Sequence, residues 1–177
     1  MDRLKRYLLG GKRIWKDFFQ NKVAASYVCP MKVRIMILKS FGHHIEKDCY
    51  FSPKAFLGWG KGKLSIGKNS FVNYNVFFDL GDNITIGSNV NIAMNVKLIN
   101  STHQIGNKNR RAGEKKEEEI VIGDGTWIGA DSIIMPGVTI GTGVIIGAGS
   151  LVLEDCQNDS IYVGRPAKLL RRIEDEN

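Results

Sequence analysis

The chain has 177 residues, of which 43% are hydrophobic and 24% are charged, and its formal net charge is +7 at pH 7. A chain of this length can bury one sizeable core, and the composition is that of an ordinary globular protein that needs no second domain. No apolar run approaches the roughly 20 residues that a membrane-spanning helix needs, so no such helix is expected.

The positive charge is concentrated at the N-terminal end. Residues 1–39 contain ten Lys or Arg and two Asp or Glu, a balance of +8, so the remaining residues sum to −1. Residues 2–22 place leucine and aromatic side chains among basic ones, which predicts one or two short amphipathic helices broken near Gly10 and Gly11. Such a segment can lie on an anionic membrane surface, although we favour the simpler interpretation that it packs its aromatic face on the body of its own oligomer.

A second helix is predicted over residues 31–41, ending at Gly42, so a basic and partly helical segment covers residues 1–43. Beyond it, large apolar residues recur every six positions. Neither a helix nor a simple strand gives this spacing, because their side-chain periods are 3.6 and 2. A loop with three glycines, at positions 58, 60 and 62, interrupts the register, and a shift of two residues follows Phe78. The register positions in this part of the chain are Ile45, Phe51, Leu57, Ile66, Val72, Phe78, Leu80, Ile86, Ile92 and Leu98.

The clearest repeats begin at Ile122 and read IGDGTW, IGADSI, IMPGVT, IGTGVI, IGAGSL and VLEDCQ. Each unit starts with an aliphatic residue, and its fifth position is always small or β-branched. Four units have glycine second, where a side chain would obstruct a corner. A hexapeptide β-helix has this pattern, since each unit is a short strand plus a turn and three units close one triangular coil. We therefore predict a mainly β fold, with a parallel β-helix over residues 44–159.

Two segments leave this register. Gln104, Arg110 and Lys116 fall on in-phase positions, but such side chains cannot occupy an apolar core. Residues 104–119 are therefore predicted to be extruded as a loop that re-enters the coil at residues 120–122, and long loops on a repeat scaffold often carry function. In the tail, residues 160–177, Pro166 precedes AKLLRRIEDEN, which predicts a short amphipathic helix that closes the last coil.

The three cysteines, Cys29, Cys49 and Cys156, are far apart and form no CxxC pair. This favours reduced thiols and argues against a disulfide frame or a zinc site. Cys156 falls on an inward-facing repeat position, where we expect it to fill the core and not to act as a nucleophile. Residues 10–13 and Lys16 also interrupt the apolar core that a signal peptide needs, so we expect a cytoplasmic protein.

Two segments closely resemble the hexapeptide-repeat acetyltransferases, namely WIGADSIIMPGVTIGTGVIIGAGSLVLED, residues 127–155, and GRPAKLLRR, residues 164–172. Within that superfamily the chain is most similar to the maltose, galactoside and nodulation-factor O-acetyltransferases and their relatives that acetylate bacterial surface polysaccharides. The resemblance runs from about Ile66 to Arg172. It implies a left-handed β-helix, a homotrimer with active sites between adjacent subunits, and acetyl coenzyme A as the donor.

Acetyl transfer to a hydroxyl needs a base, and His103 is the best candidate. It ends a coil just before the extruded loop, and a neutral imidazole can accept a proton near pH 7. LINSTHQ also fits the family's pattern, in which a histidine at this place is the catalytic base. By the same resemblance, Asn73 and Asp79 in FVNYNVFFD match residues that bind the acceptor sugar. The spacing is one residue shorter than in the family, so Asp79 can equally be a turn residue before Gly81.

The resemblance also assigns the donor site. The backbone N–H of Ala130 is expected to stabilise the oxyanion, because a rigid amide on a coil corner needs no reorganisation. Ala148 matches a position along which the pantetheine arm runs, and Lys168 and Arg171 match basic residues that meet the phosphates of coenzyme A. The expected reaction is direct transfer to a hydroxyl of a sugar or surface-polysaccharide precursor, with His103 as the base and no covalent enzyme intermediate.

Other functions stay open at this stage. The acceptor can be an amine on an amino sugar or on another small molecule, because the same base and groove serve. A carbonic anhydrase on this scaffold needs three histidines around zinc. The chain has three in all, and two of them, His43 and His44, are adjacent and expected to be structural or surface residues, so no metal is expected. A non-catalytic β-helix scaffold is the last alternative. Nucleic-acid binding is set aside because the basic segment lacks an aromatic readout motif.

Overall fold

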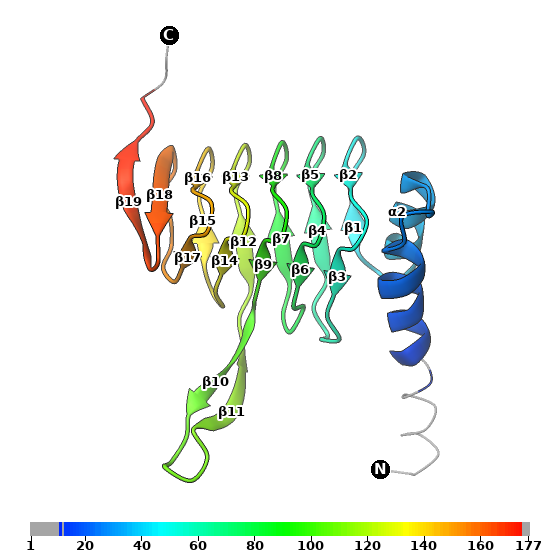
Figure 1. Ribbon diagram of the computed structural model, residues 1–177, viewed down its shortest axis with the longest axis horizontal. Coiled ribbons are helices and arrows are strands. Elements are labelled where there is room, and N and C mark those ends of the chain that lie inside the picture. Colours follow the sequence, from blue (N-terminus) through cyan, green and yellow to red (C-terminus); the bar gives the residue numbers. More distant parts are fainter. Residues whose placement is uncertain (1–10, 12, 175–177) are drawn as a thin grey trace.

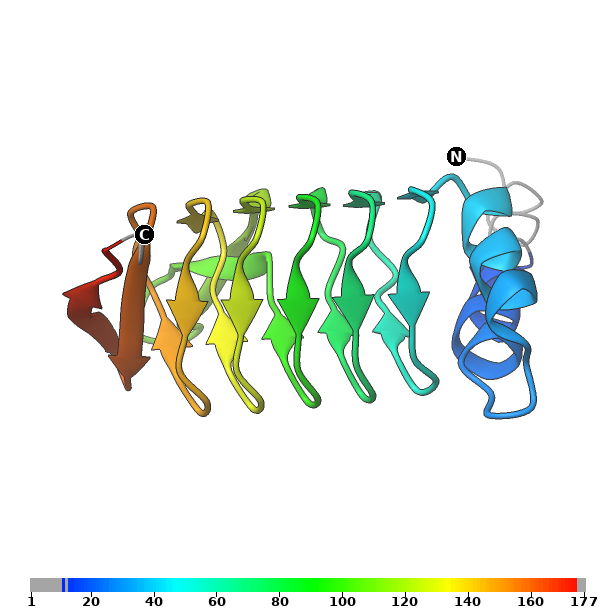
Figure 2. The ribbon, with the colours of Figure 1, turned by 90° about the horizontal axis from the view of Figure 1, so that it is seen from above.

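The computed structural model describes residue 11 and residues 13–174, and it shows a three-sided parallel β-helix with helices at one end (Figure 1). Each coil contributes one short strand to each of three faces, and the coils stack along the axis (Figure 2). Five coils are complete, and a sixth begins with a bridge from Ile140 to Cys156 and continues into the last hairpin. The predicted mainly β fold with a parallel β-helix is confirmed.

The faces are named here by the order in which a coil visits them. Face 1 consists of β1 (His44–Ile45), β4 (Leu64–Ile66), β7 (Ile84–Ile86), β12 (Ile120–Ile122) and β15 (Thr139–Ile140). Face 2 consists of β2 (Tyr50–Phe51), β5 (Phe71–Val72), β8 (Asn91–Ile92), β13 (Trp127–Ile128), β16 (Ile145–Ile146), β18 (Ser160–Gly164) and β19 (Ala167–Arg172). Face 3 consists of β3 (Phe56–Leu57), β6 (Phe77–Phe78), β9 (Lys97–Leu98), β14 (Ile133–Ile134) and β17 (Leu151–Val152).

The core is made by the residues of the six-residue register. On each face the last residue of every strand in the complete coils points inward and pairs in register with its counterparts on the adjacent coils, as Ile45 does with Ile66 and Ile122 with Ile140. All of these positions are buried, and so are the fifth positions of the six repeats that begin at Ile122. Leu80 is the exception in the predicted register. It is buried, but it lies in the turn between β6 and β7 at a φ of 59° and not on a strand.

The glycine-rich loop after β3 stacks on the turn after β6. A Cβ atom on Gly58 would lie 1.8 Å from the carbonyl oxygen of Asp79, and one on Gly60 would lie 1.6 Å from that of Leu80. Only glycine allows such close approach of two backbones. The extra residues that break the register therefore form matching turns at the corner where face 3 leads back to face 1, which we call the 3–1 corner.

After β9 the chain reaches the 3–1 corner for the third time, and here the segment that was predicted as a loop leaves the prism. It is a regular antiparallel hairpin, formed by β10 (Ser101–Ile105) and β11 (Ala112–Glu117), and it projects away from the prism (Figure 1). The chain leaves the coil at Ser101, three residues earlier than predicted, and re-enters at Ile120 as predicted. A long segment of mostly exposed residues can satisfy its backbone by pairing with itself, which the register argument did not consider.

The predicted C-terminal helix is wrong. Residues 160–172 form the hairpin β18–β19, and β18 pairs in parallel with β16 on face 2. The sequence AKLLRR is a good helix former, but the edge of the last coil presents a row of unpaired backbone groups that a strand can satisfy and a helix cannot. Tertiary pairing overrides local propensity here.

The N-terminal helices cover the opposite end of the prism. Residues 13–18 are α-helical and continue into the π-helix η1 (Phe19–Ala24), while α2 (Met31–Ser40) is the helix predicted over residues 31–41. Residues 2–10 and 12 of the predicted amphipathic segment lie outside the described residues. The side chain of Asn21 exchanges two hydrogen bonds of 2.8 Å with the backbone of Leu57, and so covers the edge strand β3. No helix among the described residues is long and apolar enough to cross a membrane.

His43 is a buried structural residue and His44 lies on the surface, as expected from the sequence. His44 is exposed and lies 3.9 Å from the carboxylate of Glu46. His43 is buried between the helices and the first coil, where its Nδ1 accepts a hydrogen bond of 3.1 Å from the amide of Leu64 and its Nε2 lies 2.6 Å from the side-chain amide of Gln20. Burial, with a smaller effect of Lys16 and Lys63, lowers the pKa of His43 to about 4.

We expect acid to weaken the attachment of this helical cap. Unfolded His43 has an ordinary pKa of 6.5 while the folded protein holds it at about 4, so the unfolded state binds the proton more readily. The contribution of His43 to the free energy of unfolding is fully present above pH 6.5 and decreases as the pH falls towards 4. At pH 5 the loss from this residue alone is about 2 kcal/mol. Urea unfolding at pH 7.5 and pH 5 measures the loss. His43→Gln should reduce the pH dependence, and His44→Gln should retain it; equal pH dependence in the two variants would contradict the assignment.

Candidate active site

The hairpin β10–β11 carries His103 away from the prism. His103 lies opposite Lys115 in the antiparallel register, and the register shifts between His103 and Ile105. Bulges of this kind re-aim side chains and are frequent near functional sites. Gly113 lies across from the irregularity, where a Cβ atom would come within 2.9 Å of the Gln104 carbonyl oxygen. The close approach of the two strands thus depends on glycine at this position.

The hydrogen bond of His103 fixes its tautomer. Its Nδ1 lies 3.0 Å from the carbonyl oxygen of Gly113, and a carbonyl oxygen can only accept, so Nδ1 carries the hydrogen and donates it. In the neutral ring Nε2 is then unprotonated. The side chain is exposed, and Nε2 has no partner among the described residues. The arrangement leaves one basic nitrogen free to take a proton from a bound molecule.

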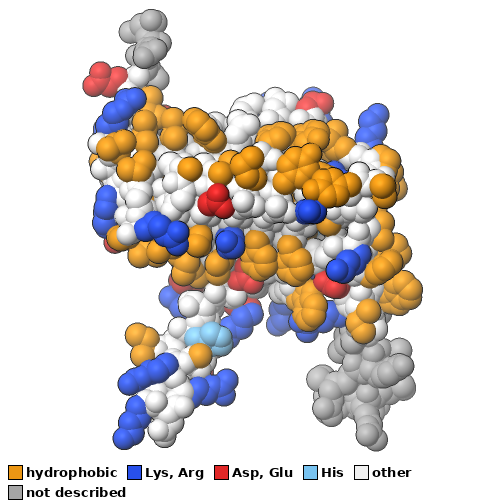
Figure 3. All heavy atoms as spheres, viewed as in Figure 1, with side chains coloured by type: hydrophobic (Ala, Val, Ile, Leu, Met, Phe, Trp, Pro, Cys, Tyr) orange, Lys and Arg blue, Asp and Glu red, His pale blue; other side chains and the backbone are white. Residues whose placement is uncertain are grey.

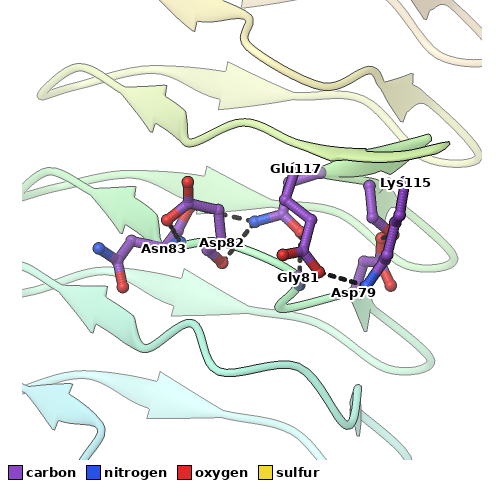
Figure 4. A network of polar contacts seen from close by, with 8 residues as sticks. Asp79, Gly81, Asp82, Asn83, Lys115 and Glu117 are labelled. Carbon is purple, nitrogen blue, oxygen red and sulfur yellow. Dashed lines mark hydrogen bonds and ion pairs between the residues drawn. The ribbon is translucent and has the colours of Figure 1, made fainter. Parts of the chain in front are cut away.

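The root of the hairpin is fixed to the turn between β6 and β7 (Figure 4). Asn100 is fully buried, and its side chain accepts from the Gly81 amide at 2.8 Å and donates to the carbonyl oxygens of Asp82 and Asn83 at 2.5 and 3.2 Å. Its own carbonyl oxygen accepts from the amide of Glu118 on the returning strand, at 3.0 Å. One side chain and its backbone therefore hold both strands of the hairpin to the prism.

Asp79 lies beside this root. Its carboxylate accepts a short hydrogen bond from the hydroxyl of Ser101, the first residue of β10. Gly81 packs against the same residues, since a Cβ atom there would lie 2.9 Å from the Ser101 Cβ and 3.1 Å from Glu117 Oε1. Asp79 is half-buried, so it serves as a contact of the turn, and its remaining oxygen can meet a ligand. Asp79 therefore binds the hairpin root through one carboxylate oxygen, and its other oxygen has no hydrogen bond among the described residues.

A second group of candidate residues lies at the corner between faces 2 and 3, the 2–3 corner. Asn73 follows β5 there, and its side-chain oxygen accepts from the Tyr74 amide at 2.8 Å. It borders an open hollow of about 370 Å³ on face 2, lined by Phe71, Asn73, Asn91, Ile92, Ala93 and Trp127. The indole of Trp127 is exposed on this face. The hollow combines aromatic surface with amide groups, as sugar-binding and cofactor-binding sites commonly do.

Ala130 and Ala148 occupy the same corner on successive coils. The carbonyl oxygen of Ala130 accepts from the Gly149 amide at 2.7 Å, which fixes the peptide plane, while the N–H groups of Ala130 and Ala148 have no acceptor among the described residues. A Cβ atom on Gly129 would lie 2.5 Å from the nitrogen of Ala148, so the coils approach closely here. The corner therefore presents fixed, unpaired backbone donors, which are suited to a developing oxyanion or to the amides of an extended ligand.

The basic residues expected at the phosphates lie on β19, at the end of the solenoid. Lys168 is exposed, and its Nζ lies 3.4 Å from a carboxylate oxygen of Glu154. Arg171 is exposed as well and contacts the carbonyl oxygen of Arg172. Both side chains are free to reorient towards an anion, because an exposed ion pair of this kind contributes little to stability.

Apart from Lys168 and Arg171 on β19, the predicted site residues thus separate into two groups within one chain. His103 and Asp79 belong to the 3–1 corner, whereas Asn73, Ala130 and Ala148 belong to the 2–3 corner, with face 3 between them. Cys156 belongs to neither group. It is buried on the inner side of the sixth coil, and burial raises the pKa of its thiol to about 12, so it stays protonated and fills the core as expected. No cluster of three metal-binding side chains is found in residues 13–174.

The chain is similar to several known proteins. Residues 119–154 match the family described as "Bacterial transferase hexapeptide (six repeats)". The galactoside O-acetyltransferase of Escherichia coli K12 is 32% identical over 169 residues, which cover 96% of this chain and 80% of that enzyme. The chain belongs to the hexapeptide-repeat acetyltransferases.

Two further similarities extend this assignment. A hexapeptide-repeat acetyltransferase of Vibrio cholerae, solved with acetyl coenzyme A, superimposes with a TM-score of 0.80 at 28% identity, over 98% of this chain and 91% of that one. A relative from Staphylococcus aureus strain MRSA252 is 43% identical over 119 residues, 67% of this chain. The match spans 58% of the length of that relative.

Some residues of this hexapeptide-repeat acetyltransferase were not identified from the sequence. Asn100 and Ser101 fix the hairpin, and Trp127 lines the hollow at face 2. Asn100 could have been noticed in the sequence, because it is a polar residue that lies two positions after the inward-facing Leu98. Trp127 stands at an outward-facing position of a repeat, where the repeat pattern sets no requirement on the side chain and so gave no reason to select it.

Proposed function

We propose that this protein transfers an acetyl group from acetyl coenzyme A to a hydroxyl of a sugar or surface-polysaccharide precursor. The observation that carries the proposal is the hydrogen bond from His103 to Gly113, which leaves Nε2 exposed and basic. A general base needs this tautomer, and a carbonyl acceptor at Nδ1 stabilises the imidazolium that forms. The Escherichia coli and Vibrio cholerae acetyltransferases support the same class of reaction.

The reaction is a direct transfer. Nε2 of His103 takes the proton of the acceptor hydroxyl as its oxygen attacks the carbonyl carbon of the thioester. The unpaired N–H of Ala130 donates to the oxygen that becomes negative in the tetrahedral intermediate. When the carbon–sulfur bond breaks, the imidazolium returns the proton to the leaving thiolate. The products are the acetyl ester and the free thiol, and His103 is neutral again.

The other candidate residues bind the two substrates. Asn73 and Asp79 offer an amide and a carboxylate to the hydroxyls of the acceptor. Ala148 presents an unpaired amide along the corner that the pantetheine arm follows, and Lys168 and Arg171 reach the phosphates at the end of the solenoid. We also place the protein in the cytoplasm, because acetyl coenzyme A is made inside the cell and the three cysteines are free thiols.

We infer that a complete site needs more than one copy of the chain, arranged as a homotrimer. The hairpin that carries His103 projects away from the prism (Figure 1). The unpaired amides of Ala130 and Ala148 lie at the 2–3 corner. A threefold axis can bring the 3–1 corner of one copy to the 2–3 corner of the next, and a cyclic trimer uses each corner once. A solution mass of a single chain in the active preparation would contradict this arrangement.

Thiol release from acetyl coenzyme A tests the function. The panel contains galactosides, maltose, nucleotide sugars and amino sugars, and the expected result is release that depends on an added sugar and yields an alkali-labile ester. Release only with amino sugars, giving an alkali-stable amide, would favour N-acetylation. Absence of coenzyme A binding in a calorimetric titration would contradict the enzyme and leave a non-catalytic scaffold.

A further inference from the structure

Three aromatic side chains form an exposed cluster at the helical end of the molecule. Trp15 stacks on Phe19 with ring centroids 6.0 Å apart, and Phe18 meets both rings edge-on at 6.3 and 5.5 Å. The exposed fractions of Trp15, Phe18 and Phe19 are 62%, 47% and 38%. Within one chain these rings therefore pack on one another and stay partly exposed, and we call them the aromatic cluster.

The charged residues around the aromatic cluster are mainly basic. Arg13 and Lys22 are exposed on the same helical segment, and the Arg13 guanidinium lies 4.5 Å from the centre of the Trp59 ring. Asp17, the one acid of residues 13–24, is already engaged, since its carboxylate accepts from Asn21 at 2.8 Å and from the Trp59 indole at 2.6 Å.

The adjacent helix adds to this surface. α2 has no acidic residue, and Lys32, Lys39 and the thioether of Met36 are exposed on it. Hydrophobic side chains gather at the helical end in the space-filling view (Figure 3). This end of the molecule thus joins exposed aromatic rings to an excess of positive charge.

We propose that this end of the protein docks on an anionic lipid bilayer, with the aromatic cluster inserted at the level of the head groups. Tryptophan and phenylalanine favour that depth, because the ring is apolar and the interface is still partly hydrated. Lysine and arginine side chains near the surface add electrostatic attraction to anionic lipids, which salt weakens. Residues 13–39 contain six Lys or Arg and one Asp, a balance of 6 − 1 = +5, so this end of the protein should prefer an anionic surface.

The geometry also makes docking compatible with the proposed reaction. The helices cover one end of the prism, while the hairpin leaves it near the middle of the solenoid and β19 ends it at the far side (Figure 1). Contact through the helical end therefore leaves the 2–3 corner open along several coils. An enzyme held in this way would meet acceptors that are attached to lipids, although docking itself does not depend on the reaction.

Sedimentation of the full-length protein with vesicles tests the proposal. Vesicles of phosphatidylcholine with one quarter phosphatidylglycerol should bind the protein at least tenfold better than pure phosphatidylcholine, and 0.5 M NaCl should remove most of the difference. The tryptophan emission should shift to the blue on binding. The double variant Trp15→Ser, Phe18→Ser should lose at least tenfold in binding with an unchanged melting temperature. Leu153→Ser, which changes a side chain of similar exposure far from the cluster, should bind as before.

Three results would overturn it. Binding that is equal for both vesicle types, or that the double variant leaves intact, would remove the aromatic cluster and its basic neighbours from any membrane contact. A change in the mass of the oligomer in the double variant would mean that the cluster is covered by another copy of the chain. In each case thiol release from acetyl coenzyme A is measured in parallel without lipid, so failure of docking is distinguished from failure of the enzyme.

Discussion

Replacing His103 by alanine should lower kcat/KM for acetyl transfer by roughly a hundredfold or more, with little effect on folding. The side chain is exposed on a hairpin, and among the described residues its side-chain hydrogen bond is to the Gly113 carbonyl oxygen, so its loss leaves no cavity in the core. The proton of the acceptor hydroxyl would then have no base within reach. Thiol release from acetyl coenzyme A with a saturating acceptor measures the effect.

His44→Ala is the matched control, because it removes an exposed histidine from face 1 of the prism. We expect its activity to be within about twofold of the native protein, as for most exposed substitutions away from a site. Affinity for coenzyme A, measured by calorimetry, should be the same in both variants, since neither histidine is among the residues that we propose to bind coenzyme A. Activity of His103→Ala equal to that of His44→Ala would exclude His103 as the base.

The coil register could be predicted because a single physical requirement repeats. Every complete coil must place one apolar side chain per face into a narrow interior, so Ile122, Ile128 and Ile134 report the fold by spacing alone. The two breaks in the six-residue register could be predicted for the same reason, because the spacing of the apolar residues changes there. Leu80 was misassigned to the strand register because it is apolar and buried, yet it reaches the core from a turn with a positive φ. Hydropathy does not distinguish these two ways of entering a core.

The strands of the hairpin and of the C-terminal tail could not be predicted from the repeat spacing, and the cause differs between the two. Residues 101–117 satisfy their own backbone, so no pattern of burial marks them as strands. Residues 167–172 become a strand because β18 offers a free edge, and this depends on where the coil ends. The grouping of site residues was also hidden. Asn73 and Asp79 are six positions apart in the sequence, but they lie on either side of face 3, which follows only from tracing each coil.

Replacing Asn100 by leucine should lower kcat tenfold to a hundredfold, because this side chain sets the direction of the hairpin that carries His103. The change leaves the Gly81 amide and the Asp82 and Asn83 carbonyl oxygens without their partner in a buried place. Each unsatisfied group costs about 1–3 kcal/mol, so a lower melting temperature is expected too. A small displacement of a catalytic group is enough to cost much of the rate.

A structural role alone would also lower stability, so the control must be a buried polar residue away from the hairpin. Ser70 is suitable, because its hydroxyl donates to the Gly87 carbonyl oxygen at 2.9 Å and accepts from the Val90 amide at 3.1 Å, at the corner between faces 1 and 2. Ser70→Ala should lose stability and keep kcat when assayed well below its melting temperature. Asn100→Leu, assayed equally far below its own melting temperature, should have a lower kcat. Its KM for acetyl coenzyme A should be unchanged. Equal kcat in the two variants would mean that Asn100 stabilises the prism without directing His103.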